Sequence, residues 1–189
     1  MLTAEFLKSK FHEAATYEAH VSAGAPTKQE AWNRVYNQVA LTETHRALLR
    51  AFTRKMHVIV SSGVWCGDCV AQCPLIQRIG EASPNIEVRF ADRDEHADLS
   101  SQLAINAGVR VPVAVFMAED FELVSTFGDR TLSRYRALAD RLLGAACELP
   151  HAPIGDHEVA ETLQDWVNEF ERVQLLLRLS TRLRQKHGD

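Results

Sequence analysis

A Cys-X-X-Cys spacing, formed by Cys66 and Cys69, constrains this chain more than any other feature of its sequence. The residues before it, Met56–Val60, are apolar and mostly β-branched, as is typical of a buried strand. The residues after it predict a helix to about Ala82, so the motif lies at a strand-to-helix turn. At a helix start, free amides and the helix dipole favour the thiolate of Cys66. Cys69 follows one turn later, so the spacing predicts attack by Cys66 and resolution by Cys69.

The remaining cysteines leave a second interpretation open. The chain has four cysteines, and Cys73 lies one turn after Cys69, while Cys147 is distant. Zinc ribbons also use Cys-X-X-Cys but need a second ligand pair, which this sequence lacks, so we assign no metal ligands. A metal site built from Cys66, Cys69 and Cys73 stays an alternative. On its own, Cys73 is interpreted as a small buried hydrophobe, because a cysteine at i,i+4 on a helix is poorly placed for a disulfide. Cys147 is also interpreted as a packing residue.

The pattern around the motif predicts an α/β core. Further apolar strands are expected at 86–90, 111–117 and 122–127, the last two joined as a hairpin, with helices at 98–107 and 131–143. The order over residues 56–143 is therefore strand, helix, strand, helix, strand, strand, helix. We expect a core of four strands, or one that borrows a short strand from elsewhere.

The segments on either side of this core are predicted to be helical. Residues 1–55 are expected to form an N-terminal extension of helices, with a capping box at Thr27–Glu30 and a second start at Thr42. The core is assigned to residues 56–147 and a linker to residues 148–155. One long helix is expected over 156–189, capped by Asp156. Its apolar stripe should pack on the core and the N-terminal helices of the same chain, with dimerisation as the alternative. Its basic last turns suit the helix dipole.

Three features beside the cysteines complete a recognisable set. Trp65 precedes Cys66, Pro74 lies inside the following helix, and Val111-Pro112 precedes an apolar strand about forty residues later. This ordered set, over roughly residues 50–145, resembles the thioredoxin superfamily, and Cys-Gly-Asp-Cys resembles its bacterial thioredoxin-like members. The resemblance implies a mixed sheet flanked by helices, with Cys66 as nucleophile and Cys69 as resolving thiol.

The resemblance also implies a substrate groove. Pro112 would be a cis-proline facing the disulfide, its backbone pairing with substrate as an added strand. Trp65, Gly67, Asp68, Val111 and Gly128 would line the same groove. The sequence departs from the family in two respects that bear on proton transfer. Val60 stands where typical thioredoxins carry a buried aspartate six residues before the nucleophile, and their partner lysine is not evident in the second strand, 86–90.

Asp68 bears on the direction of the reaction. A carboxylate two residues from Cys66 opposes the thiolate, which disfavours the dithiol and makes the protein more reducing. We therefore expect a reductase, provided that the carboxylate is not held away from the sulfurs by a salt bridge. The expected partners are a disulfide-containing protein or small-molecule substrate and an electron-donating thiol system, without a bound cofactor. The alternative is a redox-inactive thioredoxin-fold binding module.

Composition narrows the functional classes. A net charge of -4 and a pI near 6.1 do not favour nucleic acid or an anionic membrane as partners. The first residues lack the basic start and apolar run of a secretory signal, and no apolar run approaches the roughly 20 residues that span a bilayer. A cytoplasmic location is expected.

Overall fold

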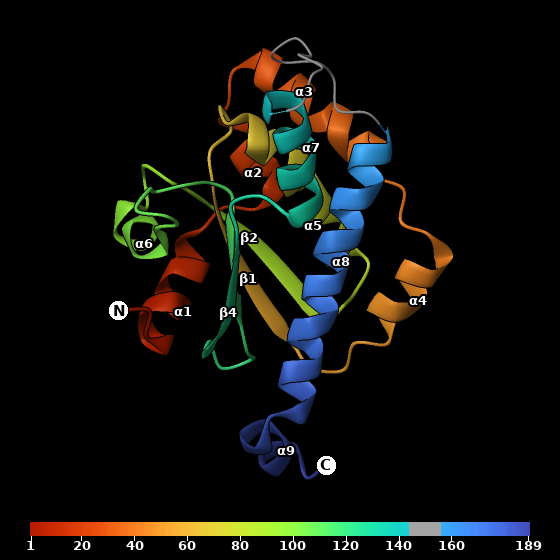
Figure 1. Cartoon of the computed structure of the whole chain (residues 1–189). Coiled ribbons are helices and arrows are strands. Elements are labelled where there is room, and N and C mark those ends of the chain that lie inside the picture. Colours follow the sequence, from red (N-terminus) through yellow and green to blue (C-terminus); the bar gives the residue numbers. More distant parts are fainter. Residues whose placement is uncertain (144–155) are drawn as a thin grey trace.

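The computed structural model describes residues 1–143 and 156–189, in which a four-stranded sheet carries helices on both faces (Figure 1). The predicted linker at 148–155 and Cys147 lie outside the described residues. The strands are β1 (Met56–Ser62), β2 (Ile86–Asp92), β3 (Val113–Met117) and β4 (Leu123–Gly128). The helices before β1 are α1 (Ala4–Glu13), α2 (Tyr17–Ser22), α3 (Pro26–Gln38) and α4 (Glu43–Arg50). Those after it are α5 (Gly67–Glu81), α6 (Ala97–Ser100), the 3₁₀ turn η1 (Ser101–Leu103), α7 (Leu132–Leu143), α8 (Asp156–Leu179) and α9 (Thr181–His187).

The sheet confirms the α/β prediction. Its order is β2-β1-β3-β4, with β1 parallel to β2 and antiparallel to β3, and β3 antiparallel to β4. Every residue of β1 is buried, as expected for a central strand with helices on both faces. A single antiparallel bridge between Ala15 and Phe90 adds one residue of pairing at the β2 edge.

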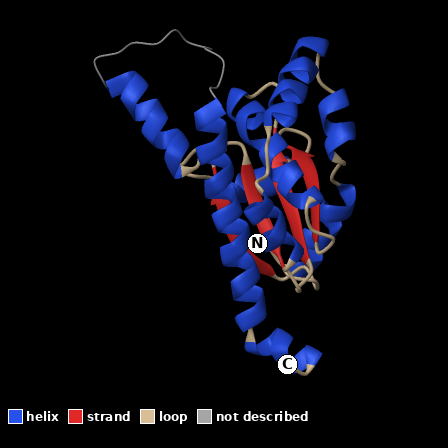
Figure 2. Cartoon of the chain, turned by 90° about the vertical axis from the view of Figure 1, so that its right-hand side faces the viewer, coloured by secondary structure: helices blue, strands red, loops and turns tan. Residues whose placement is uncertain are grey.

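Helices lie on both faces of the sheet (Figure 2), and a hydrophobic cluster lies beneath them on each face. On one face, Leu7 and Phe11 of α1 pack with Ile59 and Val115, together with residues of α6 and η1. On the other, α3, α5 and α8 pack over Val58, Val60 and Phe116. The cysteine helix α5 is therefore enclosed between the N-terminal helices and α8.

The N-terminal segment is helical but begins and ends differently from the prediction. The first helix, α1, ends at Glu13, because the chain leaves the helix where Ala15 pairs with Phe90. The capping box at Thr27–Glu30 is wrong: α3 begins at Pro26, and its N-cap makes no side-chain hydrogen bond. Proline at the first helical position fixes the helix start and leaves Thr27 inside the helix. The start at Thr42 is confirmed, with His45 completing a capping box.

Two further helices are shorter than predicted. In place of the helix expected over 98–107, the chain forms the short helix α6 followed by η1. Asn106 and Ala107 adopt positive φ angles, which a right-handed helix cannot include. The final helix breaks at Ser180, whose hydroxyl caps α9. α8 packs mainly on α5, α7 and β4, with a smaller contact to α4 of the N-terminal extension.

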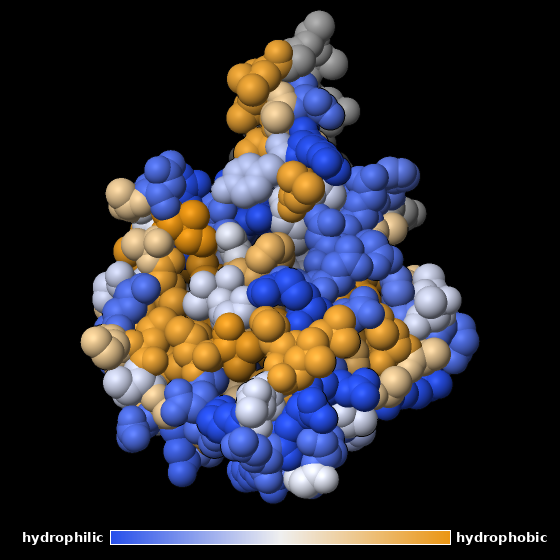
Figure 3. Space-filling view, turned by 60° about the horizontal axis from the view of Figure 1, so that its bottom comes forward, coloured by the Kyte–Doolittle hydropathy of each residue, from blue (hydrophilic) through white to orange (hydrophobic). Residues whose placement is uncertain are grey.

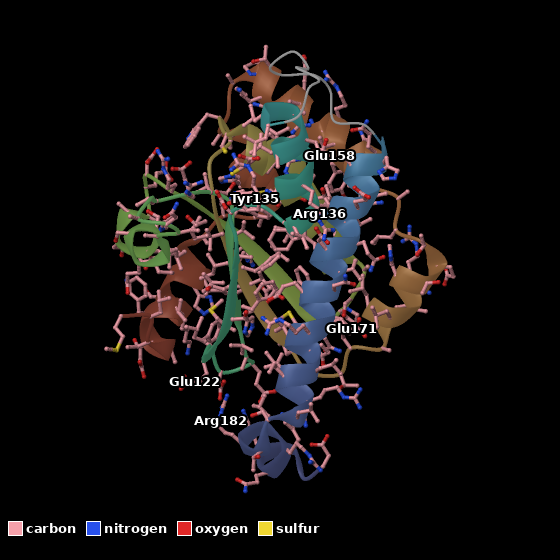
Figure 4. The ribbon with its side chains drawn as sticks, in the orientation of Figure 1. Glu122, Tyr135, Arg136, Glu158, Glu171 and Arg182 are labelled. Carbon is pink, nitrogen blue, oxygen red and sulfur yellow. The ribbon has the colours of Figure 1, made fainter. Side chains whose placement is uncertain are left out.

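The basic end of the chain forms ion pairs with the β3–β4 turn. Arg182 pairs with Asp120, and Lys186 lies 2.5 Å from Glu119. Figure 4 shows Arg182 at the base of the molecule, with Glu122 nearby. These tertiary pairs, more than the dipole of a continuous helix, explain the basic residues there.

The surface carries both hydrophilic and hydrophobic side chains (Figure 3). No helix within residues 1–143 or 156–189 is long and apolar enough to cross a membrane. Figure 3 shows hydrophobic side chains in a band across the lower end of the molecule. The exposed large apolar residues of β4 and α8 are Leu123, Leu175, Leu176 and Leu179.

Candidate functional site

The strand-to-helix turn places Cys66 at the N-cap of α5. Its amide donates to the Gly63 carbonyl at 3.0 Å, and its side chain is partly exposed. A hydrogen bond with the Cys69 thiol and partial burial raise the pKa of Cys66, while the amides of Cys69 and Asp68 act in the opposite direction. The amides at the start of α5 therefore do favour the Cys66 thiolate, as predicted. In the reduced protein, the Cys69 thiol and burial raise the pKa of Cys66 by more than these amides lower it.

Cys69 lies beneath Cys66 and is fully buried. The Gly63 amide donates to its sulfur at 3.4 Å. Burial raises the pKa of the Cys69 thiol well above its ordinary value. The two cysteines thus differ in exposure: the Cys66 thiol is partly exposed and the Cys69 thiol is buried.

The predicted groove residues come together in part. The Cys66 thiol lies 3.7 Å from the Val111 carbonyl oxygen, and the predicted cis Val111-Pro112 bond is confirmed. Gly128 has φ +155°, and a Cβ there would overlap the Pro112 carbonyl oxygen, so only glycine allows β4 to approach so closely. Cys66, Val111, Pro112 and Gly128 therefore form one continuous wall.

Trp65 and Gly67 form the exposed rim. Trp65 is 46% exposed, and the Arg93 guanidinium lies 4.5 Å from its ring centroid. Its indole lies over Gly63, where any Cβ would clash with it. Gly67 is exposed and has open space around it. This side of the motif is therefore open to a docking partner.

Asp68 is held by two arginines. Arg130 contacts both of its carboxylate oxygens, at 3.0 and 2.5 Å, and Arg134 donates to one of them at 3.0 Å. The condition set on the sequence argument, a carboxylate free of salt bridges, is therefore not met. Asp68 instead fastens the start of α5 to the segment after β4.

Asp68→Asn is accordingly expected to lower the free energy of unfolding by about 1–3 kcal/mol, because Arg134, only 9% exposed, loses a charged partner. The Cys66 pKa should change little. Chemical unfolding followed by circular dichroism measures the first quantity, and thiolate absorbance the second. Asp94→Asn is the control: its partner is the adjacent Arg93, its side chain is 64% exposed, and it should cost less than about 0.5 kcal/mol. A fall in the Cys66 pKa with unchanged stability would contradict this role.

The segment after β4 is itself anchored from the core. Asp129 is buried and accepts hydrogen bonds from Tyr135 and Arg110, which hold its pKa below the ordinary value although burial opposes this. Gln72 of α5 donates to the Asp129 carbonyl at 2.9 Å and accepts from Trp166 of α8 at 3.3 Å. Figure 4 places Tyr135 at the start of α7, beside the upper end of β4.

The N-terminal helices support the other side of the motif. Trp32 of α3 donates to the Val64 carbonyl at 3.1 Å, and His20 of α2 lies 3.2 Å from the Ser62 hydroxyl. His20, Ser62, Arg130 and Arg134 were not predicted from the sequence. Only the four-residue spacing of Arg130 and Arg134 indicates locally that these two side chains can lie together. The contacts of His20 with Ser62 and of the two arginines with Asp68 join segments far apart in the sequence.

Burial lowers the pKa of His20 from 6.5 to about 4, so its ring is neutral at pH 7. The unfolded chain takes up this proton more readily, so the free energy of unfolding should fall as the pH falls from 6.5 through 4, by about 3 kcal/mol. His57, whose pKa burial also lowers, adds an effect of the same sign.

His20→Gln should remove most of the His20 part of this pH dependence, measured by chemical unfolding at several pH values. His157, whose side chain is 87% exposed, gives the matched control His157→Gln, which should leave the pH dependence unchanged. An equal slope in the His20 variant and the parent would show that His20 is not buried in solution.

The metal alternative finds no support in the described part of the chain. No group of three or more His, Cys, Asp or Glu side chains there is arranged to hold a metal ion. Cys66, Cys69 and Cys73 lie along one helix, with the last two inside the core.

Comparison with known proteins agrees with this geometry. A family model described as thioredoxin matches residues 14–140, more than half of the chain. A protein of unknown function from Pseudomonas aeruginosa aligns over 92% of this chain and 97% of its own, with a TM-score of 0.71 and 19% identity. An HIV epitope scaffold aligns over 86% and 97%, with a TM-score of 0.64 and 20% identity. Mitochondrial thioredoxin 3 from Saccharomyces cerevisiae covers 50% of this chain and 86% of its own at 23% identity, with a TM-score of 0.34. No curated protein sequence matches significantly.

Proposed function

We propose that this chain, which belongs to the thioredoxin family, is a thiol–disulfide oxidoreductase with Cys66 as nucleophile and Cys69 as resolving thiol. The observation that carries the proposal is the pairing of a partly exposed thiol at the N-cap of α5 with a fully buried thiol in its first turn. The wall of Val111, Pro112 and Gly128 beside Cys66 offers backbone to an extended substrate segment.

In the reaction, the Cys66 thiolate attacks one sulfur of a substrate disulfide, and the other substrate sulfur leaves as a thiolate that takes up a proton. Cys69 then loses its proton and attacks the Cys66 sulfur of the mixed disulfide. The Cys66–Cys69 bond forms as the bond to the substrate breaks, so the substrate is reduced by two electrons and the protein oxidised by two. A separate thiol system restores the dithiol.

The expected direction is reduction of the substrate. The contact with Cys69 and burial raise the pKa of Cys66. The dithiol therefore lacks the thiolate stabilisation that favours the reduced form in a disulfide-forming protein. Asp68 does not contribute to this direction, because Arg130 and Arg134 pair with its carboxylate. The direction also suits a reducing compartment such as the cytoplasm, which we include in the proposal.

Trapping tests the proposed function. Cys69→Ser should leave Cys66 joined to its substrate in a disulfide that survives denaturing electrophoresis and dissociates with dithiothreitol. The double variant with Cys66→Ser should trap nothing. Purified parent protein should also catalyse insulin reduction by dithiothreitol. Failure of both assays would favour a redox-inactive binding module.

The cysteines should differ in reactivity towards iodoacetamide. In the reduced protein, Cys66 should be modified well before Cys69 and Cys73, because both of those side chains are fully buried. Mass mapping after timed quenching measures the order. Earlier modification of Cys73 would contradict the assignment of the nucleophile.

A further inference from the structure

The buried position of Cys69 raises a question that the proposed reaction does not answer. To attack the mixed disulfide, this thiol must lose its proton, yet its side chain is fully buried. Val60, the strand residue six positions before Cys66, is apolar and also fully buried. A route for the proton must therefore pass through other groups around Cys69.

The structure contains a continuous row of polar groups that begins at Cys69. Cys73 follows one turn along α5 and is also fully buried, and its thiol contributes to the raised pKa of Cys69. The Cys73 sulfur lies 3.5 Å from the hydroxyl oxygen of Ser62 in β1. That oxygen lies 3.2 Å from Nε2 of His20 in α2. Cys73 and Ser62 are fully buried and His20 is 5% exposed, so the row is sheltered from bulk water along its length.

The row ends at a hollow that opens to solvent. His20 lines a cavity of about 730 Å³, together with Trp65 and residues of α2 and β2. The ring is held between Phe90, stacked at 5.6 Å, and Trp32, edge-on at 5.5 Å. Its Nε2 faces Ser62, and the described residues provide no hydrogen-bond partner for Nδ1. Nε2 thus contacts the Ser62 hydroxyl, while Nδ1 remains available to water in the cavity.

The charged and titratable groups around His20 permit proton release on this side. Those lining the cavity are Glu13, Lys28, Asp92, Asp94, Glu95 and His96. Asp92 favours the protonated ring, but burial outweighs it, and the pKa of His20 falls to about 4. A neutral ring can accept a proton at Nε2 while it gives one up at Nδ1, and so pass a proton on without staying charged.

We propose that Cys73, Ser62 and His20 form a proton relay that deprotonates Cys69 during resolution of the mixed disulfide. The relay rests on the proposed function and adds to it. The Cys69 proton passes to the Cys73 sulfur, the Cys73 proton to the Ser62 oxygen, and the Ser62 proton to Nε2 of His20. Nδ1 releases its own proton to water in the cavity. The Cys69 thiolate then attacks Cys66 and expels the substrate thiolate, and the three relay groups are each left with one proton.

The test separates the two thiol steps with 5,5′-dithiobis(2-nitrobenzoate), added at one equivalent in a Cys147→Ser background. The first release of thionitrobenzoate reports attack by Cys66. The second reports displacement by Cys69. Stopped-flow absorbance between pH 6 and 9 follows both phases.

Two substitutions at one position provide the matched comparison. Cys73→Ala removes the second member of the relay, whereas Cys73→Ser keeps a group that both accepts and donates a proton. With alanine, the second phase should slow at least about tenfold at pH 7 and its half-maximal pH should rise by about one unit or more. With serine, the second phase should stay within about threefold of the parent. Ser62→Ala should behave like Cys73→Ala, and the first phase should be unaffected in all three.

Each outcome bears on the relay. A second phase that is unchanged in both alanine variants would overturn it, as would slowing at every pH without a shift in the profile, or equal slowing with alanine and serine. Circular dichroism identifies a variant that has failed to fold. If either Ser62→Ala or Cys73→Ala does not fold, the other variant provides the test. A parent protein that shows no second phase would instead overturn the proposed function.

Discussion

Cys66→Ser is expected to lower turnover in the insulin assay by at least about a thousandfold, to the uncatalysed rate. A serine hydroxyl at this position has no neighbouring base to activate it and is a weak nucleophile at neutral pH. The substitution removes one sulfur from the partly exposed N-cap of α5 and leaves the buried Cys69 in place. The free energy of unfolding should therefore change by less than about 1 kcal/mol.

The matched control is the same substitution at Cys147, which lies outside the residues that the thioredoxin family model matches. Cys147→Ser should keep the turnover of the parent. Substantial activity in Cys66→Ser would show that another thiol is the nucleophile, and Cys66→Ser,Cys69→Ser would then identify whether it is Cys69.

Trp166→Ala should have the largest effect on stability, lowering the free energy of unfolding by about 3–5 kcal/mol. The side chain is fully buried between α8 and α5, and its ring meets Phe127 of β4 edge-on at 5.0 Å. Its indole nitrogen also donates to Gln72, which in turn holds the Asp129 carbonyl. The alanine variant should therefore loosen the segment after β4 as well as leave a cavity.

Chemical unfolding followed by far-ultraviolet circular dichroism measures this loss without relying on tryptophan fluorescence. Trp65→Ala is the control, because that ring is 46% exposed, and it should cost less than about 1 kcal/mol. Equal effects at the two tryptophans would show that α8 does not pack on α5 in solution.

The sequence predicted the elements whose signals are local. β1 was expected from a run of β-branched residues, α5 from the residues after the cysteines, and the start of α4 from Thr42. The helix ends that were missed depend on other parts of the chain. α1 stops where Ala15 pairs with Phe90, and α9 turns back where Arg182 and Lys186 meet the β3–β4 turn.

The same distinction applies to the candidate site. Cys66, Cys69, Pro112 and Gly128 were predicted from spacing and from the family resemblance, and the structure brings them together. The pairing of Asp68 with Arg130 was missed because 62 positions separate them. His20 carries no local signal either, since only the fold places a residue of α2 against β1.

The long-range anchoring of the motif has a consequence for folding on the ribosome. Ser62 meets His20 across 42 positions, and Gln72 meets Trp166 across 94. Contacts of such sequence separation form late, because long loops must close first. A nascent chain that has emerged through α7 can form the sheet and the Cys66–Cys69 pair, but the α5 face that receives Trp166 stays uncovered until α8 has been synthesised. During that interval Gln72 and the apolar surface around it face solvent, so the nascent chain passes through a stage that exposes a part of α5 which the finished protein buries.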